Sequence, residues 1–180
     1  MYWCRLKSLT TIALIGSILL GSLACRPDIK QIKYFDIKKY FNGDVSRLKK
    51  QNKLVDKTVT INGITETKKV KINNWEQELN LFTGSDINSP AWKNSYAITD
   101  NDEFLIYKAK DPDLKMREMI IRRDKQQVKW ILIFNRTKNL LYQTAEKLSY
   151  FPDSLYLIEK KQSVRVIGTN FYRIRGIIER

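Results

Sequence analysis

Acidic side chains that could bind a cation gather at two places in the second half of the chain. One is Asp100-Asn101-Asp102-Glu103 and the other is Asp111-Pro112-Asp113. Their oxygen atoms are ligands of the kind that calcium prefers. Both runs lack the glycine and the distal glutamate of a calcium-binding loop, and Asp, Asn and Pro are also typical turn residues. The sequence therefore favours two turns over a calcium site.

Paired carboxylates could also hydrolyse a glycosidic bond, because one can act as the acid and the other as base or nucleophile. The candidates are Glu76, Glu78, Asp86 and Asp113. Nothing in their spacing brings any two of them to the separation that the reaction needs. Hydrolysis of a glycan or of peptidoglycan through such a pair is therefore the alternative hypothesis, not the leading one.

The residue types that most often do catalysis are scarce. Among 180 residues there is no histidine, and the only cysteines are Cys4 and Cys25. Histidine is the usual general base, zinc ligand and partner of a Ser or Cys nucleophile. The sequence also lacks a glycine-rich phosphate loop and a Gly-x-Ser-x-Gly elbow. We expect no catalytic residue, no cofactor and no metal site, and this favours a non-enzymatic protein.

The chain is strongly basic, with 33 Lys and Arg against 19 Asp and Glu and a formal net charge of +14. Such a balance suggests an anionic partner, for example lipid headgroups, acidic glycans or nucleic acid. No run of four basic residues occurs, so lysines spread over solvated surfaces explain the charge more simply. Aromatic residues beside basic ones, as in Lys129-Trp130 and the segment 171–175, could form a stacking surface. Alternation along strands favours instead that these aromatic residues lie in the core.

The first 25 residues have the pattern of an export signal. Arg5 and Lys7 precede an uncharged stretch, residues 8–25, that is apolar in its centre and ends in small residues. A basic, then an apolar, then a small-residue region is typical of a secretory signal. Glycine and other small residues near the end would let a peptidase bind an extended backbone.

The last four residues of this stretch, Ser22-Leu23-Ala24-Cys25, resemble the lipobox of bacterial lipoproteins. The resemblance implies that residues 1–24 are a signal peptide and that the Cys25 thiol receives a diacylglyceryl group. Cleavage after Ala24 would leave Cys25 with a new backbone amine, which would be acylated too, with chains such as palmitate. Residues 25–180 would then be the mature chain, anchored stably by two or three acyl chains. Arg26 stands where an inner-membrane retention signal has aspartate, which favours the outer membrane if the cell has two.

Two alternatives to lipidation are an uncleaved membrane anchor and an ordinary secretory signal, in which Cys25 would be incidental. The uncharged stretch is barely long enough to span a bilayer, and it contains several Gly, Ser and Thr residues. All three interpretations place the chain beyond residue 26 outside the cytoplasm, in the cell envelope or beyond it.

Two segments before residue 90 have helical periodicity. Ile37, Phe41, Val45 and Leu48 recur at spacings of four, four and three, although Asn42-Gly43 could split this helix. A second helix is expected to start after Asn74, a plausible N-cap, with apolar residues at 75, 79 and 82.

The segment between these helices predicts a β-hairpin. Asn62-Gly63 favours a tight turn with positive φ at both residues, which joins two antiparallel strands. Pairing Ile61 with Ile64 puts Thr60 opposite Thr65. One face of the hairpin is then apolar and the other carries threonines and lysines, so the hairpin should be half-buried.

From residue 95 onward the chain is β in character. We expect strands at 95–99, 103–110, 115–123, 128–135, 140–150, 155–167 and 171–178, with Val128, Trp130, Leu132 and Phe134 on one face of their strand. Short connections make successive strands antiparallel. The expected fold is one α+β domain, in which a curved antiparallel β-sheet, formed by the long meander and the N-terminal hairpin, packs against the two helices.

The leading hypothesis is a membrane-anchored envelope lipoprotein that acts as a non-enzymatic binding or structural module. Its partner would be an anionic lipid, a glycan or an envelope protein, and export disfavours nucleic acid. The order of elements resembles that of periplasmic lipoprotein carriers, which implies an apolar groove for acyl chains between sheet and helices. A polar cleft with paired acids would favour the hydrolase instead, and a solid core with neither would favour a scaffold.

Overall fold

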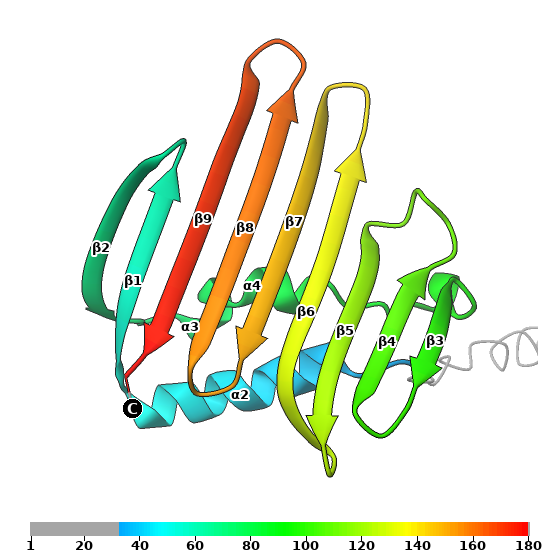
Figure 1. Ribbon diagram of the computed structural model, residues 1–180, viewed down its shortest axis with the longest axis horizontal. Helices are drawn as coiled ribbons and strands as arrows, with labels where there is room; N and C mark the ends of the chain where they lie inside the picture. Colours follow the sequence, from blue (N-terminus) through cyan, green and yellow to red (C-terminus); the bar gives the residue numbers. More distant parts are fainter. Residues whose placement is uncertain (1–32, 180) are drawn as a thin grey trace, which may run out of the picture. The chain divides into compact units, whose positions relative to one another are not determined.

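The computed structural model describes residues 33–179, and the predicted signal peptide and Cys25 lie outside the described residues (Figure 1). Ile32–Arg180 form a compact unit. Its buried apolar side chains form a single core cluster. A unit with its own core is expected to fold without the residues that precede it.

The unit is an α+β fold built on one open sheet of nine antiparallel strands, as the sequence predicts. The strands are β1 (Leu54–Ile61), β2 (Ile64–Lys71), β3 (Tyr96–Asp100), β4 (Phe104–Ala109), β5 (Met116–Asp124), β6 (Gln127–Lys138), β7 (Tyr142–Phe151), β8 (Leu155–Val164) and β9 (Gly168–Ile178). Their order across the sheet is β2-β1-β9-β8-β7-β6-β5-β4-β3. The last seven strands are the predicted meander. The sheet is not closed, so β2 and β3 are its edges.

The hairpin of β1 and β2 has the predicted register. Ile61 pairs with Ile64 and Thr60 with Thr65, and the φ angles of Asn62 and Gly63 are 49° and 89°. Such a turn matches the twist of the two strands. The other edge of β1 pairs with the C-terminal strand β9, which joins the two ends of the unit in one sheet.

Helix α2 (Ile37–Gln51) is continuous through Asn42-Gly43. The carboxylate of Asp36 caps it by accepting a hydrogen bond from the backbone N–H of Lys39 at 2.9 Å. Glycine inside a helix costs about 1 kcal/mol relative to alanine. The four apolar residues that the periodicity selects are all buried, and their burial offsets that cost: Ile37, Phe41, Val45 and Leu48.

The predicted second helix is instead two single turns, α3 (Trp75–Glu78) and α4 (Asn80–Thr83), separated at Leu79. Asn74 is the N-cap as predicted, and its Oδ1 accepts a hydrogen bond from the N–H of Gln77 at 3.0 Å. The apolar residues at positions 75, 79 and 82 are buried. The residues of this segment that face the core were therefore predicted correctly, whereas the predicted length of the helix was wrong. A 3-10 turn, η2 (Pro90–Trp92), follows before β3.

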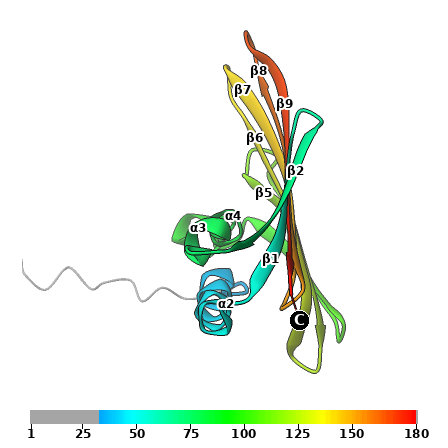
Figure 2. The same ribbon diagram turned by 90° about the vertical axis from the view of Figure 1, so that its left-hand side faces the viewer.

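The helices lie on one face of the sheet and leave the other face bare (Figure 2). Beneath them, side chains that alternate along the strands fill the core, with Phe41, Phe82 and Tyr150 at ring distances of 4.9–5.8 Å. A pocket of about 600 Å³ does open between α3, α4 and the strands β1, β2, β8 and β9. It is lined by the Lys57–Glu78 ion pair as well as by Ile158 and Ile174, so it is not the dry apolar groove of a carrier.

Candidate functional site

The two acidic clusters are turns in the structure. Asn101 lies in the β3–β4 connection, where its Oδ1 accepts hydrogen bonds from the N–H groups of Glu103 and Phe104. Asp111 accepts one from the N–H of Asp113 at 2.8 Å. Among residues 33–179, no group of three or more His, Cys, Asp or Glu side chains is placed to hold a metal ion.

Three of the four carboxylates proposed for hydrolysis form ion pairs with different lysines. Glu76 pairs with Lys49, Glu78 with Lys57, and Asp86 with Lys38, while Asp113 lies in a turn after β4. The hydrogen bond from Lys49 lowers the pKa of Glu76, whereas a general acid needs a raised one. Glu78 also accepts the hydroxyl hydrogen of Tyr156 at 2.7 Å, so it fastens α3 to the sheet.

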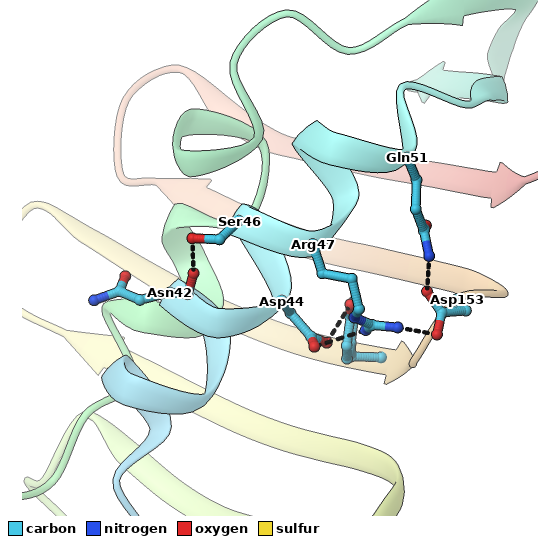
Figure 3. Close-up of polar contacts among 7 residues, drawn as sticks. Asn42, Asp44, Ser46, Arg47, Gln51 and Asp153 are labelled. Carbon is cyan, nitrogen blue, oxygen red and sulfur yellow. Dashed lines mark hydrogen bonds and ion pairs between the residues drawn. The ribbon is translucent and has the colours of Figure 1, made fainter.

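A polar network on α2 ties this helix to the β7–β8 turn (Figure 3). Arg47 forms ion pairs with Asp44, at 2.6 Å, and with Asp153 of the turn. Gln51 donates a hydrogen bond to Asp153 at 3.3 Å. The hydroxyl of Tyr150 donates a hydrogen bond to the carboxylate of Asp44 at 2.7 Å. Burial raises the pKa of Tyr150, and the neighbouring Asp44 carboxylate raises it further. The charged groups of this network, Asp44, Arg47 and Asp153, pair with one another, so the network positions the helix.

The bare face of the sheet carries a wide apolar surface, which we call the open face. Register shows that its side chains alternate with those of the core, for example Leu132 between the buried Ile131 and Ile133. Its apolar members come from six adjacent strands: Phe104, Ile106, Ile120, Trp130, Leu132, Phe134, Ala145, Phe151, Leu155, Leu157, Phe171 and Ile177. An apolar surface of this extent on a folded unit marks an interaction site.

The expectation for the strand 128–135 needs a correction here. Trp130, Leu132 and Phe134 share a face as predicted, but that face is the open one and not the face that the helices cover. Val128 does not share it, because the pairing with β5 shifts between Arg122 and Arg123, and Val128 packs against the core. The signal that could have found the open face is present in β6, whose apolar residues occupy both faces.

A groove of about 620 Å³ crosses the open face from β6 to β1, within the size range of small-molecule sites. Its apolar side chains are Phe134, Ala145 and Phe171. Cationic side chains surround them on the same face: Arg136, Lys147, Lys161 and Arg173. One carboxylate stands on this face of the groove, that of Glu159, and Arg173 pairs with it at 3.5 Å.

The other three of these four cations form no ion pair within residues 33–179 and are available to a ligand. The Lys161 ammonium lies 5.3 Å from the centre of the Phe171 ring. Arg136 and Lys147 form no side-chain ion pair with any residue of the described part. The segment 171–175, predicted to contribute its aromatic residues to the core, therefore places Phe171, which is 52% exposed, on the groove.

Comparisons with protein-family models, curated proteins and solved structures gave no match to this chain. Within residues 33–179, none of the helices has the length and apolar character needed to span a bilayer.

Proposed function

We propose that this chain is a non-enzymatic binding module of the cell envelope, anchored to a membrane through Cys25, which holds an anionic amphiphile on its open face. The observation that carries the proposal is the groove, where an apolar floor lies among cations. An alkyl chain would cover Phe134, Ala145 and Phe171, and its anionic head would meet Lys147 or Arg136.

Physical reasons favour this ligand over a neutral one or a polar glycan. Removing apolar surface from water contributes about 25 cal/mol per Å², so an alkyl chain gains most from an apolar floor. An anionic head gains further from cations that no carboxylate neutralises. The hydrolase alternative has less support, because three of its four candidate carboxylates form ion pairs with three different lysines.

The membrane anchor is supported by the lipobox resemblance and by the length of chain behind it. Seven residues, 26–32, separate Cys25 from the first described residue. An extended chain covers at most about 3.5 Å per residue, so a lipidated Cys25 would keep the folded unit within about 30 Å of the bilayer. A module for amphiphiles would then lie beside their source.

The ligand is tested by calorimetric titration of residues 26–180 with dodecanoate. Dodecyl maltoside, which has the same chain and a neutral head, is the matched probe, and both stay below their micelle concentrations. We expect dodecanoate to bind at least tenfold more tightly. Reversing two groove cations, Lys147→Glu with Lys161→Glu, should lower its affinity about tenfold, since each exposed charge contributes up to about 1 kcal/mol.

The control is Lys39→Glu with Lys50→Glu, the same change of net charge on exposed positions of α2. This variant should bind dodecanoate as the wild type does. Equal affinity for the two probes, or no loss in the groove variant, would contradict the proposal. A stable dimer that Leu132→Lys dissociates would assign the open face to a second copy of the chain instead.

The anchor is tested separately, on the full chain expressed in bacteria. We expect the wild type in the membrane fraction, with an N-terminal Cys25 whose mass includes a diacylglyceryl group and an additional acyl chain. Cys25→Ser should lose all of the acyl mass. A wild-type protein that is soluble and unacylated rules out the anchor, and it leaves the groove to be judged by the titration alone.

A further inference from the structure

The tips of two neighbouring hairpins expose large aliphatic side chains to solvent. In the β6–β7 tip Leu140 is 86% and Leu141 70% exposed, and in the β8–β9 tip Val166 is 93% and Ile167 78% exposed. Hairpin turns ordinarily hold Gly, Asn, Asp or Ser, since these residues suit both the backbone and the water around it. Four aliphatic residues at two adjacent tips therefore point to an apolar environment for them.

The two tips have hydrogen-bonded turns and lie side by side. Asn139 fixes the first turn, because its Oδ1 accepts hydrogen bonds from the N–H groups of Leu141 and Tyr142 at 2.9 and 2.8 Å. The backbone N–H of Arg165, in the second tip, donates to the carbonyl of Leu141 at 3.0 Å. The aliphatic side chains are thus presented together by a defined backbone.

The tips also project from the body of the unit. Figure 1 shows both turns at the same end of the sheet, at the far ends of β7 and β8, and Figure 2 shows these strand ends rising beyond the helices. They can therefore meet a flat surface before α2, α3 or α4 does. The tip of the β1–β2 hairpin points to the same side and exposes Ile64.

The charge around the tips is of one sign. Segments 135–145 and 160–173 contain no Asp or Glu, and their basic residues are Arg136, Lys138, Lys160, Lys161, Arg165 and Arg173. Within the described part, Lys160 pairs with Glu146 and Arg173 with Glu159, whereas the other four form no ion pair. The aliphatic side chains lie at the ends of the hairpins and most of the cations lie further back along the strands. This order matches an anionic bilayer, in which the hydrocarbon lies deeper than the headgroup phosphates.

We infer that the β6–β7 and β8–β9 tips insert into the interface of a bilayer that contains anionic lipid. Leu140, Leu141, Val166 and Ile167 enter the acyl boundary, and the four free cations contact the headgroup phosphates. This contact requires neither Cys25 nor the apolar floor of the groove, although two of its cations, Arg136 and Lys161, also line the groove. It orients the unit, because it brings the groove, whose Phe171 and Arg136 lie on the strands below the tips, next to the membrane.

The test uses residues 26–180, which carry no acyl chain, and vesicles of phosphatidylcholine with or without 30% phosphatidylglycerol. We expect co-flotation with the anionic vesicles at least tenfold above that with the neutral ones, falling with added salt. Leu140→Asn with Val166→Asn should lower binding at least tenfold. The control Ile98→Asn changes an exposed aliphatic residue on the edge strand β3 and should leave binding unchanged.

Insertion itself is read from tryptophan fluorescence. In V166W the added indole should be quenched by brominated phosphatidylcholine in anionic vesicles, and in I98W it should not be. No vesicle binding, equal binding of the tip variant, or absence of quenching in V166W would overturn the inference. Capture of the tips by a protein while vesicles fail to bind would also overturn it. The tip variant should still bind dodecanoate. A failure of the proposed membrane insertion is therefore distinguishable from a failure of the proposed ligand binding in the groove.

Discussion

Replacing Gly176 by alanine is expected to lower the free energy of unfolding by about 2–6 kcal/mol. Gly176 of β9 lies directly opposite Tyr156 of β8, and the Tyr156 ring rests on its Cα. A Cβ at this position would overlap the ring carbons well inside van der Waals contact. The ring is fully buried and lies edge-on to Trp75 at 6.1 Å, so it cannot move aside without disturbing α3.

Moving the ring would also break the hydrogen bond from its hydroxyl to Glu78. Overpacking costs about 1–3 kcal/mol, and an unsatisfied buried group adds about 1–3 kcal/mol. The measurement is urea unfolding followed by circular dichroism. In Gly176→Ala with Tyr156→Ala, the combined loss should be smaller than the sum of the single losses, because the second change removes the overlap.

The matched control is Gly43→Ala, in the middle of α2. A Cβ there meets no atom within 4 Å, and alanine suits a helix better than glycine does. This variant should be as stable as the wild type or up to about 1 kcal/mol more stable. If Gly176→Ala proved as harmless as Gly43→Ala, the packing of Tyr156 described above would be wrong.

Raising the pH from 10 to 12 is expected to lower the free energy of unfolding by about 2 kcal/mol for each buried tyrosine that stays protonated in the folded chain. Burial raises the pKa of Tyr150 and of Tyr156 above 10, and hydrogen bonds to Asp44 and Glu78 add to the two shifts. Burial also raises the pKa of Tyr96, to about 12. Ionising a phenol inside the core would place an unpaired charge there, or force the hydroxyl out.

The sign follows from proton counts. Below pH 10 the tyrosines keep their protons in both states, so their contribution to stability is constant. Above pH 10 the unfolded chain loses protons that the folded chain retains, and stability falls by about 1.4 kcal/mol per pH unit for each such tyrosine. This contribution to stability is lost progressively as the pH rises toward the pKa values that the tyrosines have in the folded chain.

The measurement is urea unfolding at several pH values, with tyrosinate absorbance recorded in parallel. In Tyr150→Phe the slope of stability against pH above 10 should decrease by about one proton, and in the double variant with Tyr156→Phe by about two. Tyrosinate absorbance should rise together with unfolding. Complete ionisation of the tyrosines in a chain that stays folded would contradict the prediction.

Local features of the fold could be predicted from sequence, because their causes are local. Asn62-Gly63 specifies a turn whose twist suits a hairpin, and this alone sets the register of Ile61 with Ile64. Spacing of apolar residues selects the buried side of α2, and Asn74 marks a helix start since its side chain satisfies a backbone N–H. The second helix was wrong in length, because its break at Leu79 depends on packing and not on a breaker residue.

The candidate site depends on contacts between residues that are far apart in the sequence. That β1 pairs with β9 is decided by contacts between residues more than a hundred positions apart, which no periodicity records. The two apolar faces of β6 are visible in the sequence, but which one the helices cover depends on how α2, α3 and α4 cross the sheet. The groove joins side chains from strands that are adjacent only in the folded sheet.

By itself, then, the sequence determines the elements, the antiparallel meander and the turns, because hydrophobic spacing and turn chemistry act over a few residues. It also carries the lipobox resemblance at Cys25, on residues that precede the folded unit. Only the tertiary structure decides that one face of the sheet stays bare, that Phe171 lies among cations, and that two aliphatic tips stand together. The physical reason is that burial is a property of the assembled layers, so a residue's exposure is fixed only once every strand has its neighbour.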